Sequence, residues 1–319
     1  MVEDPIPVLI EQIDRERMKA DVLYLAQDPL PFRKLSYTRQ GQVKCSLYEA
    51  DDYIQGKLES WGYAVEREGV MVQAFRCDTS KPKAHQYSPP HADDPTATAY
   101  NLYAERPSAA GSLEIVLLLA HKDSQSWVDS PGANDNAVGT AALLEIARVL
   151  SDYEPRRTIR LLFCNEEHRP WTSVTAAENA RDRGDRLVAI YNLDGIGRGT
   201  PEDREAGRKT NVTLYTEDEG ERFADLMTRV NEDYGLGLVQ RKQRRERPGD
   251  DDGSFVNAGY RHAVINIGSY PYGDPAYHTE QDVVENVDFE NLALGTKLSL
   301  AAAIRVDRGK ADDGRQQRR

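Results

Sequence analysis

The sequence predicts an α/β fold, a three-layer sandwich in which a mixed, mostly parallel central sheet is covered by helices on both faces. Three observations lead to this class. Segments typical of strands and helices alternate from about residue 100 onward, which favours parallel strands joined by helical crossovers. Residues 113–120 are almost entirely apolar, as a strand buried on both faces should be. Residues 137–150 have the composition of a largely buried helix.

The first part of the chain is predicted to be helical. Over residues 1–30, the side chains of Leu9, Ile13, Ala20 and Leu23 fall roughly on one face of a helix, and charged residues occupy the rest. We therefore expect this segment to pack its apolar face on the sheet.

The remaining elements follow from the same periodicities and from turn residues between them. Residues 79–97 are rich in Pro, His, Ser and Asp, which predicts a surface loop. The other helices are expected at 47–60, 137–150, 173–182, 220–231 and 289–305, and the strands at 63–66, 101–105, 113–120, 158–164, 187–193, 212–215 and 263–267.

Length and pattern favour a single domain over residues 1–310. Within it, residues 1–65 form an N-terminal helical part and residues 98–306 a core that carries the candidate site, whereas residues 311–319 form a charged tail. We find no internal repeat.

Charge and cysteine content narrow the partners and the compartment. The net charge of −12 argues against nucleic acid and anionic membranes as primary partners. No apolar stretch approaches the roughly 20 residues that cross a bilayer, and the N-terminus lacks the pattern of a secretory signal. Three widely spaced cysteines suit a reducing compartment. We therefore expect a cytoplasmic protein, whose oligomeric state is not readable from the sequence.

Chemically active side chains follow three of the predicted strands. His121 and Asp123 follow one strand, Glu166 and Glu167 the next, and Asp194 a third. Because ligands in such sheets bind at the carboxyl ends of the strands, we expect these side chains to lie near one another.

Two further residues complete a candidate metal site. Asp135 lies where the helix after the first of these strands begins, and His278 lies in a Tyr-His-Thr segment near the C-terminus. Two imidazoles and three carboxylates suit zinc, and a catalytic zinc site leaves one position open for water. Two zinc ions that share one bridging carboxylate would each have three protein ligands.

Two carboxylates remain for other roles. Asp123 is placed to accept the second ring N–H of His121, which fixes the tautomer and raises the basicity of the ligand. Glu166 is adjacent to Glu167, so that one can bind metal while the other accepts a proton from water.

The order of these motifs resembles that of the co-catalytic dizinc aminopeptidases, a family that includes bacterial secreted leucine aminopeptidases and glutamate carboxypeptidase II. The chain carries His-x-Asp, then Pro-Gly-Ala-x-Asp-Asn-Ala, then a strand ending in Glu-Glu, then Asn-Leu-Asp, and finally Tyr-His-Thr. The resemblance covers nearly the whole chain and implies the zinc exopeptidase fold, two zinc ions and a peptide substrate.

The resemblance also implies a role for each matching residue. Glu166 would be the general base, the Asp135–Asn136 peptide would be cis, and Tyr277 would hydrogen-bond the developing oxyanion. One zinc ion would be bound by His121 and Asp194, the other by Glu167 and His278, with Asp135 bridging the two.

Two departures leave the specificity open. The family usually has a Gly- and Leu-rich stretch after the Glu pair, where this chain has residues 168–173, including His168. Residues 250–252 are three consecutive aspartates where relatives often carry Ser-Asp-His, and this acidic run could alter recognition of a substrate's amino terminus. The preferred substrate residue and the physiological metal, which could also be cobalt or manganese, stay open.

Three other functions remain as alternatives to the aminopeptidase. They are a one-zinc acyltransferase like the glutaminyl cyclases, a carboxypeptidase-type hydrolase, and a non-catalytic interaction domain of the same fold. The complete set of five ligands argues against the first and the last, and the number of bound metal ions would discriminate.

Several conspicuous residues are assigned no chemistry. His168 is interpreted as structural or as lining the cleft, and Cys164 as buried packing. His85, His91 and His262 are expected to play no chemical part. Residues 195–199 are an incomplete dinucleotide motif, and the basic run 241–247 is expected to be a solvated loop with internal charge compensation.

Overall fold

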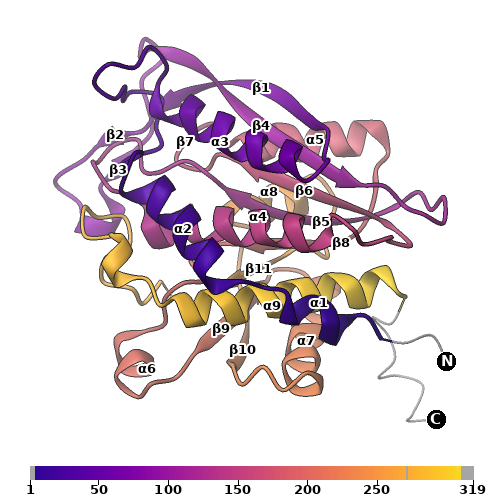
Figure 1. Ribbon diagram of the computed structural model, residues 1–319. Coiled ribbons are helices and arrows are strands. Elements are labelled where there is room, and N and C mark those ends of the chain that lie inside the picture. Colours follow the sequence, from indigo (N-terminus) through magenta and orange to yellow (C-terminus); the bar gives the residue numbers. More distant parts are fainter. Residues whose placement is uncertain (1–3, 271, 310–319) are drawn as a thin grey trace.

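The computed structural model describes residues 4–270 and 272–309 (Figure 1). The predicted tail, residues 311–319, lies outside these residues. Within them, nine strands form one sheet that runs through the molecule. The strands lie in the order β10 (Val239–Arg244), β9 (Thr210–Tyr215), β11 (Val264–Ile267), β8 (Arg186–Leu193), β5 (Glu114–His121), β6 (Thr158–Cys164), β4 (Thr96–Arg106), β1 (Val65–Ala74) and β7 (His168–Arg169).

The centre of the sheet is parallel and its flanks contain the antiparallel pairs. Strands β11, β8, β5 and β6 run parallel to their neighbours in this group. On one side β4 pairs antiparallel with both β6 and β1, and on the other side β9 pairs antiparallel with β11 and parallel with β10. The mixed sheet confirms the predicted fold class.

Helices cover both faces of this sheet (Figure 1). A small hairpin of β2 (Arg76–Cys77) and β3 (Tyr87–Ser88) stands apart from it. The helices are α1 (Ile6–Glu11), α2 (Arg15–Ala26), α3 (Ser46–Ser60), α4 (Val138–Leu150), α5 (Thr172–Arg183), α6 (Pro201–Glu205), α7 (Asp218–Asp233), α8 (Asp250–Asn257) and α9 (Phe289–Asp307), with short turns η1 (Lys83–His85), η2 (Ala133–Ala137) and η3 (Val284–Asn286).

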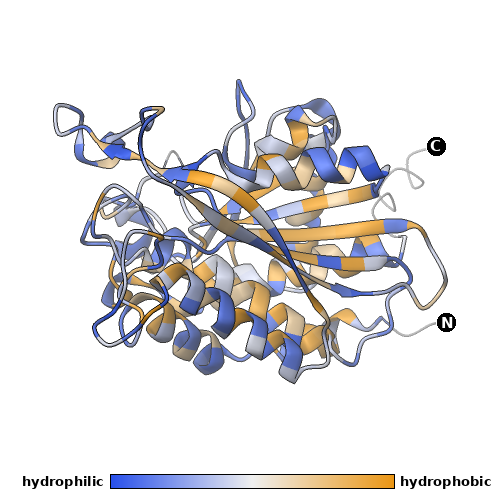
Figure 2. Ribbon diagram, turned by 90° about the horizontal axis from the view of Figure 1, so that it is seen from above, coloured by the Kyte–Doolittle hydropathy of each residue, from blue (hydrophilic) through white to orange (hydrophobic). Residues whose placement is uncertain are grey.

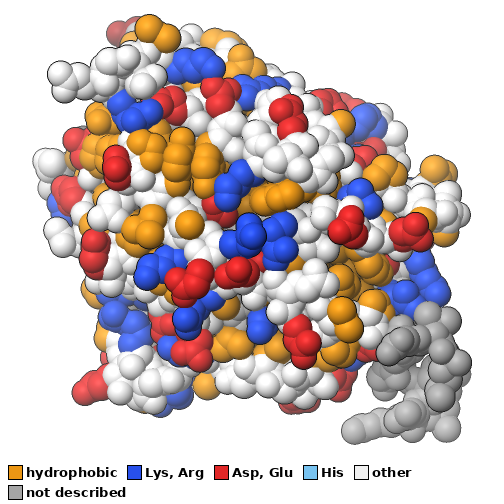
Figure 3. Space-filling model, viewed as in Figure 1, with side chains coloured by type: hydrophobic (Ala, Val, Ile, Leu, Met, Phe, Trp, Pro, Cys, Tyr) orange, Lys and Arg blue, Asp and Glu red, His pale blue; other side chains and the backbone are white. Residues whose placement is uncertain are grey.

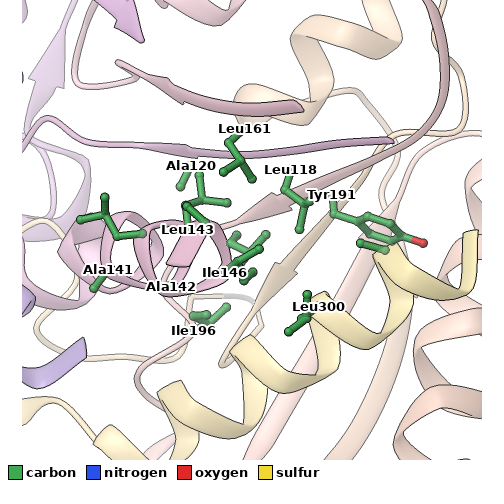
Figure 4. Close-up of a cluster of buried hydrophobic side chains, with 14 of the residues drawn as sticks. Leu118, Ala120, Ala141, Ala142, Leu143, Ile146, Leu161, Tyr191, Ile196 and Leu300 are labelled. Carbon is green, nitrogen blue, oxygen red and sulfur yellow. The ribbon is translucent and has the colours of Figure 1, made fainter. Parts of the chain in front are cut away.

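The central strand β5 is buried on both faces, as its apolar sequence predicts. Leu118 and Ala120 belong to the core under α4 and α9, whereas Leu117 and Leu119 belong to the core under α5 and α8. Figure 4 shows Leu118 and Ala120 together with Leu143 of α4, and Figure 2 shows the apolar strands between layers of helices. Each fully buried leucine stabilises the fold by about 1.5–3 kcal/mol, so the site at the end of β5 rests on a rigid base.

The predicted helix over residues 1–30 was wrong as a single element. Asp14 interrupts it, because its carboxylate accepts the backbone N–H groups of Glu16 and Arg17 and caps a new helix, α2. The break shifts the helical phase, so that Ala20 is exposed and Met18 and Val22 face the core instead.

The basic run 241–247, interpreted as a loop, instead forms much of the edge strand β10. The expected internal compensation occurs at Arg245, which pairs with Asp250 and Asp252, whereas Arg241 and Lys242 pair with residues of α6 and α7. Apolar periodicity could not reveal this strand, because charged side chains are typical of sheet edges. The helices α6 and α8 were also not predicted.

Acidic and basic side chains are interspersed over the face in Figure 3. Among the described residues, no helix combines the length and the apolar character needed to cross a membrane.

Candidate metal centre

The candidate ligands meet at one edge of the sheet. His121 is the last residue of β5, Glu167 follows β6, and Asp194 follows β8. These three strands are adjacent and parallel, so that their carboxyl ends lie side by side. Asp135 lies in η2, just before α4, and His278 lies on the loop between β11 and η3.

The two imidazoles face the carboxylates at short distances. His121 Nε2 lies 3.1 Å from Asp135 Oδ1 and 3.5 Å from Asp194 Oδ1. His278 Nε2 lies 3.1 Å from Asp135 Oδ2 and 3.4 Å from Glu167 Oε1. Asp135 therefore directs one oxygen towards each imidazole, which is the arrangement of a bridging carboxylate.

Two groups of three side chains could each hold a cation. One is His121, Asp135 and Asp194, and the other is Asp135, Glu167 and His278. Within each group the potential ligand atoms all lie within 4.8 Å of one another, and all five side chains are buried. No other such group occurs in residues 4–270 and 272–309. The structure thus brings together all five predicted ligands.

The electrostatics of the centre favour a bound cation. Burial raises the pKa of Asp194 to about 7, since a carboxylate loses hydration there. Burial disfavours the charged form of His278, but the charge of Glu167 and the contact with Asp135 outweigh it and raise its pKa to about 10. Burial also disfavours the charged form of His121, but hydrogen bonds to Asp123, Asp135 and Asp194 outweigh this effect and raise its pKa well above the usual value. Oxygen and imidazole donors in this number fit zinc.

Asp123 is a fully buried hub beside the centre. Its Oδ1 lies 3.2 Å from His121 Nδ1 and accepts the backbone N–H of Glu166 at 2.9 Å. Its Oδ2 accepts the backbone N–H of Glu167 at 2.9 Å and lies 2.8 Å from His168 Nδ1. The sequence left open whether His168 is structural or lines the cleft. Its ring is fully buried against Asp123 and does not line a cleft, which leaves the structural interpretation.

Glu166, the predicted general base, points towards the acidic helix α8. Its Oε2 accepts the backbone N–H of Asp251 at 3.1 Å. Burial and the charges of Asp251 and Asp250 raise its pKa well above the usual value, which makes this carboxylate more ready to take up a proton.

Tyr277 stacks on the ligand beside it in sequence. Its ring lies 3.7 Å from that of His278 and 4.6 Å from that of Tyr272, measured between centroids. The hydroxyl of Tyr272 in turn donates to Asp250 at 2.8 Å. The Asp135–Asn136 peptide is cis, as predicted.

Sequence reasoning missed three residues that hold the ligands in place. Arg33, fully buried, donates to the carbonyls of Lys122, Pro131 and Gly132. Asp282 accepts the backbone N–H groups of Asn134 and Asp135, both at 2.9 Å. Gln125 donates to Asp135 Oδ2 at 2.9 Å and to Glu167 Oε1 at 3.1 Å.

Only Gln125 could have been noticed, because it lies close to the His-x-Asp motif. The contacts of Arg33 and Asp282 span about 90 to 150 residues of chain, so that no local pattern announces them.

The residues to which no chemistry was assigned belong to neither ligand group. His85 and His91 are exposed. Cys164 is fully buried, and its thiol lies 3.0 Å from Asp251 Oδ2.

A model of the family described as "Peptidase family M28" matches residues 101–303, a range that contains every candidate ligand. The chain belongs to peptidase family M28. This membership confirms the resemblance inferred from the motifs. The family is one of metallopeptidases, and relatives of this chain are named zinc metalloproteases.

Relatives of this M28 chain carry consistent names. A "Probable zinc metalloprotease" from Pyrenophora teres f. teres is 23% identical, over 94% of this chain and 68% of the relative. An aminopeptidase from Aneurinibacillus sp. strain AM-1 has a similar structure, with a TM-score of 0.70 at 16% identity over 94% of this chain and 95% of that one. A glutaminyl cyclase from Bacteroides thetaiotaomicron follows, with a TM-score of 0.67 at 18% identity over 92% and 98%. At these identities the two structures show the shared zinc exopeptidase fold.

Proposed function

We propose that this M28 protein is a two-zinc aminopeptidase that releases N-terminal residues from peptides. The observation that carries the proposal is the position of Asp135, whose two oxygens face two different imidazoles at 3.1 Å each. One zinc ion would be held by His121 and Asp194 and the other by Glu167 and His278, with Asp135 shared.

The bound ions would polarise the scissile carbonyl and bring the pKa of a coordinated water to about 7. Glu166 lies close enough to His121 and Asp194 for their charges to act on its pKa, and it would take the proton of the attacking water. It then gives this proton to the leaving amine, so that the C–N bond breaks with no net change at the residue. Tyr277 would donate its hydroxyl to the oxyanion of the substrate.

The acidic surroundings support recognition of a positively charged amino terminus. Asp250 lies close enough to Glu166 for its charge to raise the pKa of that residue, and Tyr272 and Arg245 hold its carboxylate. A peptide ammonium group near these carboxylates would be stabilised by their charge. An N-acetylated peptide lacks that charge.

Substitution of Glu166 by Gln tests the mechanism. The amide cannot accept the proton of water, so kcat should fall by about 10²- to 10⁴-fold while the protein still binds zinc. The measurement combines a mass-spectrometric digest of paired free and N-acetylated peptides with metal counting by atomic emission.

Stepwise loss of residues from only the free peptides supports the aminopeptidase. Near-normal turnover in the Gln variant would exclude Glu166 as the base. A wild-type protein that binds one zinc ion and cleaves neither set of peptides would instead favour the cyclase-like acyltransferase.

A further inference from the structure

The connection between β1 and β4 is far longer than its topology requires. These strands are antiparallel neighbours and still pair at Val72 with Ala97 and at Gln73 with Thr96. A turn of two to five residues can close such a pair. Instead the chain leaves the sheet over residues 75–95, here called the excursion, and returns only at β4.

The excursion has a defined structure of its own. Its strands β2 and β3 pair with each other, and Asp78 donates its backbone N–H to the carbonyl of Gln86 at 2.6 Å. At its base, Gln73 donates to the carbonyls of His91 and Asp94. The tip between Asp78 and Gln86 is therefore presented in a fixed direction.

The tip contacts the loop that carries His278. His278 Nδ1 lies 3.0 Å from the carbonyl oxygen of Ala84. A carbonyl can only accept, so Nδ1 must carry a proton, and Nε2 is the ring nitrogen that can bind a metal. Nε2 is the atom that faces Asp135 and Glu167. Next to this contact, Lys83 pairs with Glu280 at 2.9 Å.

Aromatic rings complete the contact. The ring of Trp127 lies 5.1 Å from that of His278 at 83°, and the ring of Tyr87 lies 5.8 Å away at 85°. Tyr87 and Trp127 also touch each other at 5.3 Å. Edge-to-face contacts of this kind restrict the rotation of the imidazole.

The segment around His278 supplies the stacked ring of Tyr277 but little regular structure. The described residues between β11 and η3 form no helix or strand, and the backbone of His278 has a φ of 56°. For a residue other than glycine this conformation is rarely adopted and must be maintained by its surroundings.

We propose that the excursion is a positioning element for the His278 half of the metal site. Through the carbonyl of Ala84 it fixes the tautomer and ring orientation of His278, and it thereby sets the zinc affinity of that half. The inference rests on the proposed two-zinc function and adds a determinant that lies outside the ligand motifs.

The test replaces residues 79–85 with Asn-Gly. This hairpin turn joins Asp78 to Gln86, which already bond to each other, and keeps Tyr87 while removing Ala84 and Lys83. Zinc affinity is measured for the full chain by competition with a chromophoric chelator. We expect one of two binding steps to weaken about 10- to 100-fold, which is typical when the partner of a ligating histidine is lost. The other step should stay nearly unchanged.

Two reference variants assign the affected step. His278→Ala should abolish the same step, whereas His85→Gln should leave both steps intact, because it changes the adjacent exposed side chain and keeps the Ala84 carbonyl. Unchanged affinity in the Asn-Gly variant, or an equal loss at both sites, would overturn the proposal.

A gentler set of variants serves if the Asn-Gly variant does not fold. Lys83→Glu and Glu280→Lys each break an exposed ion pair, and the double variant restores it with the charges exchanged. We expect zinc affinity at the His278 half to fall a few-fold in each single variant and to recover in the double variant. The coupling in this double-mutant cycle is the measurement. Absence of coupling in this cycle would count against the proposal.

A metal-free measurement separates this proposal from the proposed function. If the wild-type chain binds fewer than two zinc ions, the proposed two-zinc function fails, but the proposed role of the excursion can still be tested. NMR of the metal-free proteins then still reports whether the Nδ1–H of His278 is hydrogen-bonded and exchanges slowly with solvent in the wild type and exchanges freely in the Asn-Gly variant. Equal exchange in both proteins would contradict a positioning role.

Discussion

The two histidines of the metal centre are held by different means. His121 ends a central strand, and Asp123, two residues later, faces its Nδ1 with a buried carboxylate. His278 stands on a loop and is held by a neutral carbonyl from a segment 194 residues away in the chain. The first arrangement is local and charge-assisted, whereas the second is remote and neutral.

This difference indicates which half is the more robust. A charged acceptor roughly doubles the strength of a hydrogen bond relative to a neutral one. In addition, the carboxylate of Asp123 is fixed by two backbone N–H groups and by His168. The His121 half is therefore part of the folded core, and the His278 half depends on the docking of the excursion.

The largest expected effect comes from Arg33, which belongs to the framework of the His121 half. Arg33→Met leaves the buried carbonyls of Lys122, Pro131 and Gly132 without their donor. We expect the free energy of unfolding to fall by about 3–5 kcal/mol, as measured by urea denaturation.

An exposed arginine provides the matched control. Arg15 pairs with Glu16, and their side chains are 56% and 66% exposed, so Arg15→Met should cost about 1 kcal/mol or less. Equal losses in the two variants would mean that Arg33 is no special support of the site.

The next effect concerns Asp123 itself. In Asp123→Asn the charge is lost and an amide group must face one of the donors that now surround the carboxylate. Zinc affinity at the His121 half should fall about 10- to 100-fold, with a smaller change at the other half through Glu167. The two-step zinc titration measures both, and a greater loss at the His278 half would reverse the comparison.

The half-buried imidazole of His262 shows what burial does to a histidine outside the metal centre. Burial, followed by the positive charge of Arg222, lowers the pKa of His262 to about 4. As the pH falls from 6.5 to 4, the unfolded chain binds a proton that the folded chain does not, so folding stability is lost over this range.

We expect this loss to be about 2 kcal/mol and to disappear in His262→Phe. Urea denaturation at several pH values between 7 and 4 measures it in both proteins. An identical pH dependence in the variant would show that His262 does not contribute.

The sequence by itself determined the order of the elements and the identity of the candidate ligands. Strands such as β5 and β6 are predicted from apolar runs. His121, Glu167 and Asp194 lie at or just after the ends of β5, β6 and β8, and they were expected to meet because the carboxyl ends of parallel strands form a common edge. The same reasoning failed for the charged edge strand β10 and for the break at Asp14, where polar contacts override apolar periodicity.

Only the tertiary structure decided what surrounds the ligands. The contacts of Arg33 with Gly132, of Asp282 with Asp135 and of Ala84 with His278 each join segments separated by about 100 residues or more. In each contact one partner is a backbone group, which every residue possesses, so no residue type marks that partner in the sequence. Local pattern thus predicts which side chains reach the centre, and long-range packing decides how firmly each is held.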